Sequence, residues 1–315
     1  MNSYTLELQN DKIHNIIPLV GFLSSNQDND IKIEVNQESH CLRFCGIYDL
    51  LDKFNFSSVT IYTANTVEYH DKYIIKSLYN WYYWLGRTSK FDHGVDYTWN
   101  GNKIFGCFYG RPTVDRLGIA SYLANNHRDQ SLLSLKFDIS SEDTRKQFEV
   151  QKLFSWDPAC LDDLAHLICN LKHYASKNHA YDYTTSKYDF GNQLNHLYKD
   201  IFIDLVSEAT LAGNSFLPSE KIARAILCKK SFIVMAPKYY LKYLRQIGFR
   251  TFNTIWDESY DDLGGKNRYF AVLKLIDWLA IQPLNKFQIQ IANIVDHNYQ
   301  LLCNGRFTTK IKRYE

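Results

Sequence analysis

The sequence predicts an α/β fold with parallel strands, and three observations support this prediction. Short apolar or β-branched runs alternate along the chain with stretches whose apolar residues recur at helical spacing, as in successive strand–helix–strand units. Hydrophobic residues make up 45% of the chain and charged residues 22%, a composition that supplies a packed core and excludes disorder along the whole length. The chain has 315 residues, enough for two domains at roughly 100–200 residues per domain.

The first half is predicted to contain three strands and two helices. The strands are β-branched, apolar or alternating in polarity, and they cover residues 31–35, 59–62 and 104–109. The helices carry apolar residues three and four positions apart, and they cover residues 71–85 and 113–124.

The second half repeats the alternation. Strands are predicted at 202–207 and 231–235, and helices at 161–174, 219–227, 238–247 and 268–279. A polar loop is expected at 184–189. A further polar stretch, 138–147, separates the halves, so we expect one α/β domain over residues 1–140 and a second over residues 141–315.

Composition excludes several classes of protein. Lys and Arg number 36 against 34 Asp and Glu, and a net charge of +2 excludes a polybasic nucleic-acid coat and an acidic tail protein. Apolar runs fall short of the roughly 18 residues of a membrane span. The first ten residues lack the basic start and apolar core of a secretory signal. Seven cysteines, an odd number in a long chain, indicate reduced thiols, so we expect a soluble cytoplasmic protein.

The most informative segment, 202–237, is predicted as strand, loop, helix and strand. Glu208 follows the first strand, and Ser219-Glu220-Lys221 opens the helix with Ser219 as its N-cap. Ligands of open α/β sheets bind beyond the carboxyl ends of the strands, where a helix N-terminus offers N–H groups to an anion. Lys221 would add positive charge for a diphosphate, and Glu220 would accept hydrogen bonds from sugar hydroxyls. The alternative is an ordinary capped surface helix with a solvated Lys221.

A second cluster, 110–116, follows a predicted strand of the first half. Gly110 allows a close approach of the backbone to a ligand. Arg111 and Arg116 are suited to bidentate contact with phosphate, unless Asp115 holds one of them in a structural ion pair.

The order of these residues resembles the donor-binding signature of nucleotide-sugar glycosyltransferases with two Rossmann-like domains, the GT-B type. The closest pattern is the motif of the α-1,3-fucosyltransferases: an acidic residue after a strand, a Ser/Thr-Glu-Lys triplet at a helix start, and a following strand that ends near Pro. Here these are Glu208, the triplet 219–221, Arg224 and the strand 232–237. Segments 108–116 and 240–262 also resemble uncharacterised glycosyltransferase-like proteins of phages and large viruses. The resemblance covers roughly residues 104 to 280, with a longer loop before the triplet than in the fucosyltransferases.

The resemblance implies two Rossmann-like domains with a cleft between them, an acceptor-side domain first and a nucleotide-sugar-binding domain second. Glu220 would bind hydroxyls of the donor sugar or ribose. Lys221 would neutralise the leaving diphosphate, with Arg224 assisting one helical turn further on. The residues expected to hold the donor are Gly110, Arg111, Arg116, Ser219, Glu220, Lys221 and Arg224. The implied co-substrate is a nucleotide-diphosphate sugar, with no further cofactor and no metal.

The sequence does not identify the general base or the acceptor. An inverting transfer needs a base near the acceptor hydroxyl, for which Asp115 and Glu208 are the main candidates and His14 and Glu68 are further ones. The acceptor is either a surface glycan or a hydroxymethylated base of phage DNA, the second implying action in a host cytoplasm. DNA would be held by lysines such as 229, 230, 238 and 242. The alternative function is a non-catalytic nucleotide- or glycan-binding protein.

Other signals are weak. The acidic run 257–261 would bind hydroxyls or a metal, or else form a solvated helix cap. His40, Cys41 and Cys45 lack a second ligand pair at zinc spacing. The chain contains no GxSxG, P-loop or GxGxxG motif, which argues against hydrolase, NTPase and dinucleotide-binding functions.

Overall fold

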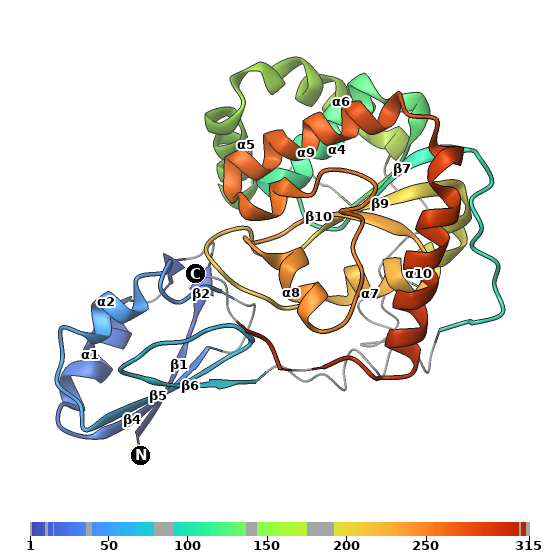
Figure 1. The fold of residues 1–315 in the computed structure, drawn as a ribbon. Helices are drawn as coiled ribbons and strands as arrows, with labels where there is room; N and C mark the ends of the chain where they lie inside the picture. Colours follow the sequence, from blue (N-terminus) through green and yellow to red (C-terminus); the bar gives the residue numbers. More distant parts are fainter. Residues whose placement is uncertain are drawn as a thin grey trace.

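The computed structural model contains two four-stranded parallel sheets flanked by helices, a mixed α/β architecture of Rossmann-like character (Figure 1). This confirms the predicted α/β class with parallel strands. The structure describes residues 2–9, 12–14, 16–35, 40–78, 91–136, 144–174, 192–308 and 310–312. In this part of the chain, no helix combines the length and the apolar character that a bilayer span requires.

The first sheet is built from the N-terminal residues. Its strands lie in the order β1 (Asn2–Leu6), β4 (Asp30–Val35), β5 (Ser58–Thr63) and β6 (Ile74–Ser77). A short antiparallel pair, β2 (Leu8–Gln9) and β3 (Lys12–Ile13), follows β1. Helices α1 (Ile16–Ser25) and α2 (Ile47–Leu51) bury leucine and isoleucine side chains in a core of their own with this sheet. The four described strands follow one another in a single direction, so the winding does not reverse among them.

In the second sheet the winding direction of the strands reverses. Its strands lie in the order β8 (Ser131–Leu135), β7 (Lys103–Tyr109), β9 (Ile201–Ser207) and β10 (Ser231–Met235). The chain passes outward from β7 to β8, returns to the other side of β7 as β9, and continues to β10. The winding therefore changes direction between β7 and β9, and this is the topological switch point at which open α/β sheets bind ligands.

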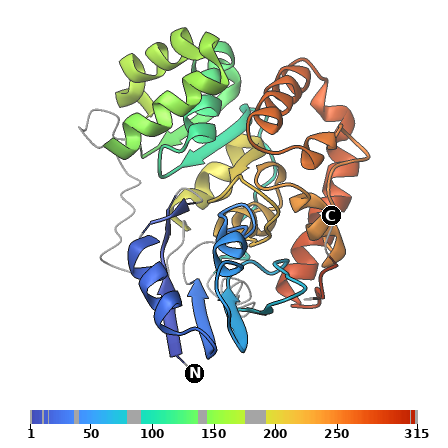
Figure 2. The same ribbon diagram turned by 90° about the vertical axis from the view of Figure 1, so that its left-hand side faces the viewer.

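The reversal also explains why helices cover both faces of this sheet. Right-handed crossovers in opposite directions put α4 (Val114–Asn126) on one face and α7 (Glu220–Leu227) on the other. Figures 1 and 2 show α5 (Thr144–Trp156), α6 (Leu161–Tyr174) and α9 (Gly265–Ala280) on the side of α4, and α8 (Tyr240–Gln246) and α10 (Gln288–Cys303) on the side of α7. Short 3-10 turns lie at Arg128–Gln130, Pro158–Cys160, Asn192–Asp200, Ser259–Asp262 and Leu284–Phe287. With both faces covered, every residue of β9 and β10 is buried.

Most predicted elements are present within a few residues of their expected bounds: β4, β5, β7, β9, β10, α4, α6, α7, α8 and α9. The predicted helix 71–85 is wrong where the structure describes it. Ile74–Ser77 is instead an edge strand, in which Ile74 and Ile75 pair with Thr60 and Ile61 of β5. The expected loop 184–189 lies outside the described residues.

The predicted division at residue 140 does not coincide with the division between the sheets. Strands β7 and β8 precede that position, and β9 and β10 follow it, yet all four belong to one sheet. The change from the first sheet to the second lies between Ser77 and Lys103. The polar stretch 138–147 therefore belongs to the connection between β8 and β9, and its first part lies outside the described residues.

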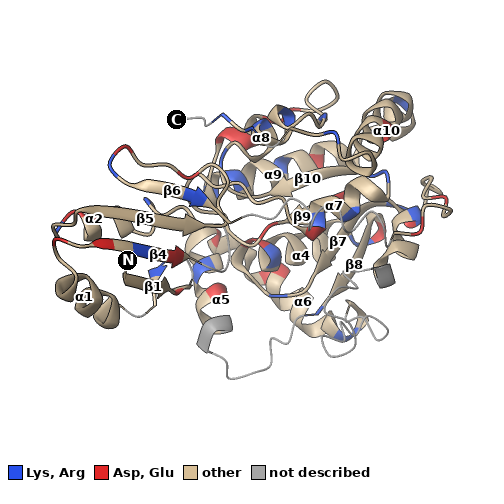
Figure 3. Cartoon of the chain, turned by 90° about the horizontal axis from the view of Figure 1, so that it is seen from below, with Lys and Arg blue, Asp and Glu red and all other residues tan. Residues whose placement is uncertain are grey.

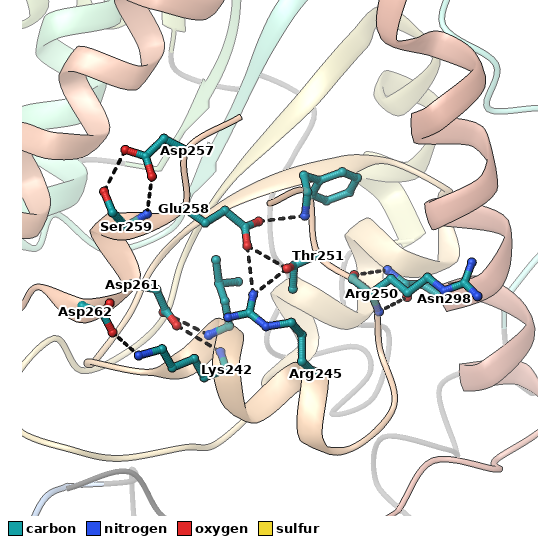
Figure 4. A network of polar contacts seen from close by, with 12 residues as sticks. Lys242, Arg245, Arg250, Thr251, Asp257, Glu258, Ser259, Asp261, Asp262 and Asn298 are labelled. Carbon is teal, nitrogen blue, oxygen red and sulfur yellow. Dashed lines mark hydrogen bonds and ion pairs between the residues drawn. The ribbon is translucent and has the colours of Figure 1, made fainter. Parts of the chain in front are cut away.

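The acidic run 257–261 divides into an exposed cap and two buried acids (Figure 4). Asp257 is exposed and accepts from the Ser259 N–H at 2.8 Å, as expected of a solvated cap, whereas Glu258 and Asp261 face the interior. Asp261 is buried, and its carboxylate accepts hydrogen bonds from the backbone N–H groups of Leu241 and Lys242, both at 3.0 Å, at the start of α8. It also pairs at 3.2 Å with Arg268, which is fully buried. Glu258 accepts from Thr251 Oγ1 at 2.7 Å, and burial raises the pKa of its carboxyl. Asp261 therefore joins α8 to α9, and Arg268 joins α9 to β10 through the Val234 carbonyl at 2.8 Å.

Candidate functional site

The candidate site lies at the switch point, where the carboxyl ends of β7 and β9 are adjacent. Strand β7 ends at Tyr109, and the next two residues, Gly110 and Arg111, are exposed. Strand β9 ends at Ser207 and is followed by the buried Glu208. The fold therefore brings together two segments, 110–116 and 207–221, that the sequence predicted to share a site.

A buried network joins these two segments. Ser207 Oγ donates to Asp115 Oδ2 at 2.5 Å and accepts from Arg116 Nε at 3.0 Å. Arg116 Nη2 also donates to the backbone carbonyls of Ser207 and Glu208, at 2.8 and 3.2 Å. Only 1% of Asp115 and 3% of Arg116 is exposed. Both residues therefore lie beneath the edge of the sheet, where they fix its two loops relative to each other.

Glu208 connects the same edge to the triplet. Its Oε1 accepts from the Ser219 N–H at 3.2 Å and from the Tyr240 hydroxyl at 2.7 Å. Its own N–H donates to the Met235 carbonyl at 2.8 Å, at the end of β10. Glu208 thus links the end of β10 through its backbone N–H, and the starts of α7 and α8 through its carboxylate, to the end of β9.

The triplet opens α7 as expected. Ser219 is the N-cap, and its Oγ accepts from the Lys221 N–H at 3.2 Å. The Lys221 ammonium lies 3.0 Å from Glu220 Oε1 and 3.9 Å from Glu208 Oε2. The Lys221 and Glu220 side chains are each about a quarter exposed, at 23% and 26%. The ammonium therefore lies between two carboxylates at a solvent-accessible helix start.

Arg224 does not join the triplet. It is buried, and its Nε donates at 2.6 Å to the Tyr198 hydroxyl, which donates at 2.5 Å to Asp204 Oδ2. Burial raises the pKa of Asp204 to about 6, although the nearby Arg224 charge opposes the rise. Arg224 points into the core between α7 and the sheet, whereas Lys221 lies at the helix start.

The loop between β9 and α7 reaches the first sheet. Phe216 N–H donates to Asn65 Oδ1 at 3.0 Å, and the Phe216 carbonyl accepts from Thr66 Oγ1 at 2.8 Å. Gly213 has a φ of +70°, and a Cβ there would lie 2.4 Å from the Cβ of Cys41. Asn65 and Thr66 follow the carboxyl end of β5, so the loops at the carboxyl ends of the two sheets meet beside the triplet.

The further candidates for a base lie elsewhere. Glu68 is close to this junction but faces inward, since its oxygens accept from Leu42 N–H at 2.9 Å and from the Tyr48 hydroxyl at 2.8 Å. Burial raises the pKa of its carboxyl. His14 is exposed beside the short pair β2–β3.

Three residues of this site were not among the predicted ones: Ser207, Tyr240 and Asn65. Ser207 carried a usable signal, because it is the last residue of a predicted strand and directly precedes an acidic residue. Tyr240 and Asn65 are brought to the site by chain segments far away in the sequence, and no local pattern marks them.

No family model matches the chain, and no curated protein matches its sequence. Within the described ranges, no group of three His, Cys, Asp or Glu side chains is arranged to hold a metal ion. A cavity of about 540 Å³ lies at the amino edge of the second sheet; none of the expected donor-binding or base residues lines it, but Lys229 and Lys230, two of the lysines considered for DNA contact, do.

Proposed function

We propose that the protein is a glycosyltransferase of the GT-B type, with a nucleotide-diphosphate sugar bound between the two α/β units at the carboxyl edge of the second sheet. The observation that carries the proposal is the position of Ser219-Glu220-Lys221. The triplet opens a helix beside the switch point of the sheet, and Glu208 and Arg116 link it to the loop after β7. Open α/β sheets generally bind their ligands at such a position, which supports the proposal.

In this proposal the exposed charges contact the donor directly. Lys221 and Arg111 neutralise the departing diphosphate, and Gly110 lets the backbone approach it. The N-cap Ser219 orients the first turn of α7 toward the same phosphates. Binding releases Glu220 from its ion pair with Lys221, because the diphosphate replaces it, and the Glu220 carboxylate then accepts from sugar or ribose hydroxyls.

The buried residues other than Glu208 have a supporting role. Arg116 and Asp115 hold the loops after β7 and β9 at the distance that the donor requires, and Arg224 anchors α7 to the sheet.

Of the two acids expected to act as a base, we assign proton removal to Glu208, because its carboxylate adjoins the triplet. Catalytic groups often become fully aligned only in the substrate complex, so the engaged Glu208 is compatible with this role.

A glycan acceptor fits better than DNA. Lys229 pairs with Asp296 at 2.7 Å, Lys230 is buried, and Lys242 pairs with Asp262. Figure 3 shows basic and acidic residues interspersed over both halves of the molecule, whereas a protein that tracks a phosphate backbone gathers its basic residues on one face.

A screen of UDP-, GDP- and CMP-sugars with the pure protein tests the proposal. We expect hydrolysis or transfer with a diphosphate donor, and loss of turnover in Glu208→Gln with the fold retained. If the protein binds a nucleotide sugar but turns over none of the donors, it is not a glycosyltransferase. Its function is then that of a non-catalytic nucleotide- or glycan-binding protein.

A further inference from the structure

The cavity at the amino edge of the second sheet lies opposite the candidate site. Its volume is about 540 Å³, within the range of roughly 300–1,000 Å³ typical of small-molecule sites. It is bounded by the segment 91–99, by the first residues of β9 and β10, by the end of α7, and by α10. Nothing in the proposed transferase reaction uses this space.

Aromatic rings form much of the cavity wall. Trp99 and Phe202 have ring centroids 4.7 Å apart, and Phe91 and Tyr97 have theirs 5.7 Å apart. Tyr299 lies across the cavity on α10, with the Lys229 ammonium 4.8 Å from its ring centroid. Such a wall favours a flat, apolar or aromatic ligand body, which gains both burial and ring contacts.

Lys230 places a buried ammonium at this wall, which also contains Asp96 and Asp296. Only 4% of the residue is exposed, and its ammonium donates one hydrogen bond, to the Tyr97 carbonyl. Among the described residues no carboxylate lies within ion-pair distance of it, whereas the neighbouring Lys229 pairs with Asp296 at 2.7 Å. Burying an ammonium with so little opposite charge among its described neighbours is unfavourable. Burial lowers its pKa to about 8, against weaker opposing effects of Cys228, Asp96 and Asp200.

We propose that this cavity is a binding site for a small ligand that combines a planar aromatic body with an anionic group, a carboxylate or a phosphate. The ring lies against Trp99, Phe202 and Tyr299, and the anion pairs with the Lys230 ammonium. The buried ammonium, without an ion pair among the described residues, favours an anionic group, and the aromatic wall favours a planar body. The proposal does not depend on the glycosyltransferase assignment.

Titration calorimetry with phenyl phosphate and indole-3-carboxylate, each compared with the neutral phenol or indole, tests the site. We expect both anions to bind the wild-type protein more tightly than their neutral partners. Lys230→Met should weaken anion binding at least tenfold and abolish the preference for the anion, while Lys230→Arg, which keeps the charge, should retain the preference.

The variant Lys221→Ala separates this site from the donor site. It removes a charge at the opposite edge of the sheet, so binding of phenyl phosphate in the cavity should stay unchanged. The proposal is overturned if the wild-type protein binds neither anion, or if folded Lys230→Met binds them as tightly as the wild-type protein does.

Discussion

The Lys230 ammonium has a stability cost that depends on pH. Its pKa is lowered from 10.5 to about 8 by burial in the folded protein. Between these two values the unfolded chain holds more protons than the folded one, so the free energy of unfolding should rise with pH in that window. Below about pH 8 the residue is charged in both states, and the full cost of burying it remains.

Lys230→Met should therefore raise the free energy of unfolding at pH 7, on the order of 1–2 kcal/mol after the loss of the hydrogen bond to Tyr97. The same variant should also show a smaller rise of the free energy of unfolding between about pH 8 and 10. Urea unfolding at pH 7 and pH 9.5 measures both effects. Lys229→Met, at an ion pair that is about half exposed, is the matched control and should change little. A Lys230→Met protein that is less stable at pH 7 would contradict this account.

Three arginines show that residue type alone does not predict whether a side chain is exposed or buried. Arg111, Arg116 and Arg224 have the same capacity to bind phosphate, and the sequence assigned them the same role. Only Arg111 is exposed, whereas the guanidinium groups of the other two bond to protein oxygens in the interior. The direction of a side chain depends on which face of α4 or α7 meets the sheet and on partners such as Ser207 and Tyr198, which are distant in the sequence.

At the scale of elements, the Asp261 carboxylate stabilises two helices at once. It caps the first turn of α8 and pairs with the fully buried Arg268 of α9. Asp261→Asn should lower the free energy of unfolding by about 3 kcal/mol, because it leaves a buried guanidinium without its counter-charge.

The neighbouring Asp262 gives a matched control for that change. Its side chain is half exposed, and its ion pair with Lys242 lies at the surface. Asp262→Asn should cost less than about 1 kcal/mol. Thermal or urea unfolding of the two variants measures this difference. Equal losses in the free energy of unfolding would show that the buried ion pair stabilises the protein no more than the exposed one.

Elements with strong local patterns were predictable. Strand β9 is a run of apolar residues interrupted by Asp204, and helix α7 begins with an N-cap. Both signals are local and do not depend on the rest of the chain. The predicted helix 71–85 is wrong because Ile74 and Ile75 pair with β5, and such long-range pairing leaves no reliable local pattern. Helix α10 was missed altogether, since Gln288–Cys303 mixes apolar and polar residues without a clear start signal.

At the scale of the whole molecule, the two sheets are joined through Asn65. Its side chain accepts from Phe216 N–H at 3.0 Å and donates to the Asn214 carbonyl at 3.2 Å. The polar stretch near residue 140 suggested a domain boundary, but in a sheet that reverses its winding, polar connections also occur within a single unit. The boundary could not be placed without knowing that β7 pairs with β9.

Asn65→Ala should loosen this junction without unfolding either sheet. Loss of the two hydrogen bonds that Asn65 makes to Asn214 and Phe216, at about 1 kcal/mol each, predicts amide exchange about thirtyfold faster in the loop that contains Phe216. Hydrogen exchange followed by mass spectrometry measures this, with β9 as an internal reference. Asn125→Ala, which removes only an exposed bond to Asp163, is the control. Unchanged exchange in the loop would mean that Asn65 does not hold the junction.

The account rests on the start of α7 as the place where a sugar donor binds, and titration calorimetry with UDP- and GDP-sugars tests this most directly. We expect the wild-type protein to bind at least one of them. Lys221→Ala should bind at least about tenfold more weakly, because a charge-assisted contact to the diphosphate is lost. Lys274→Ala, which removes an exposed charge on α9, should bind like the wild-type protein. A folded Lys221→Ala protein with unchanged affinity, or a wild-type protein that binds no nucleotide sugar, would contradict it.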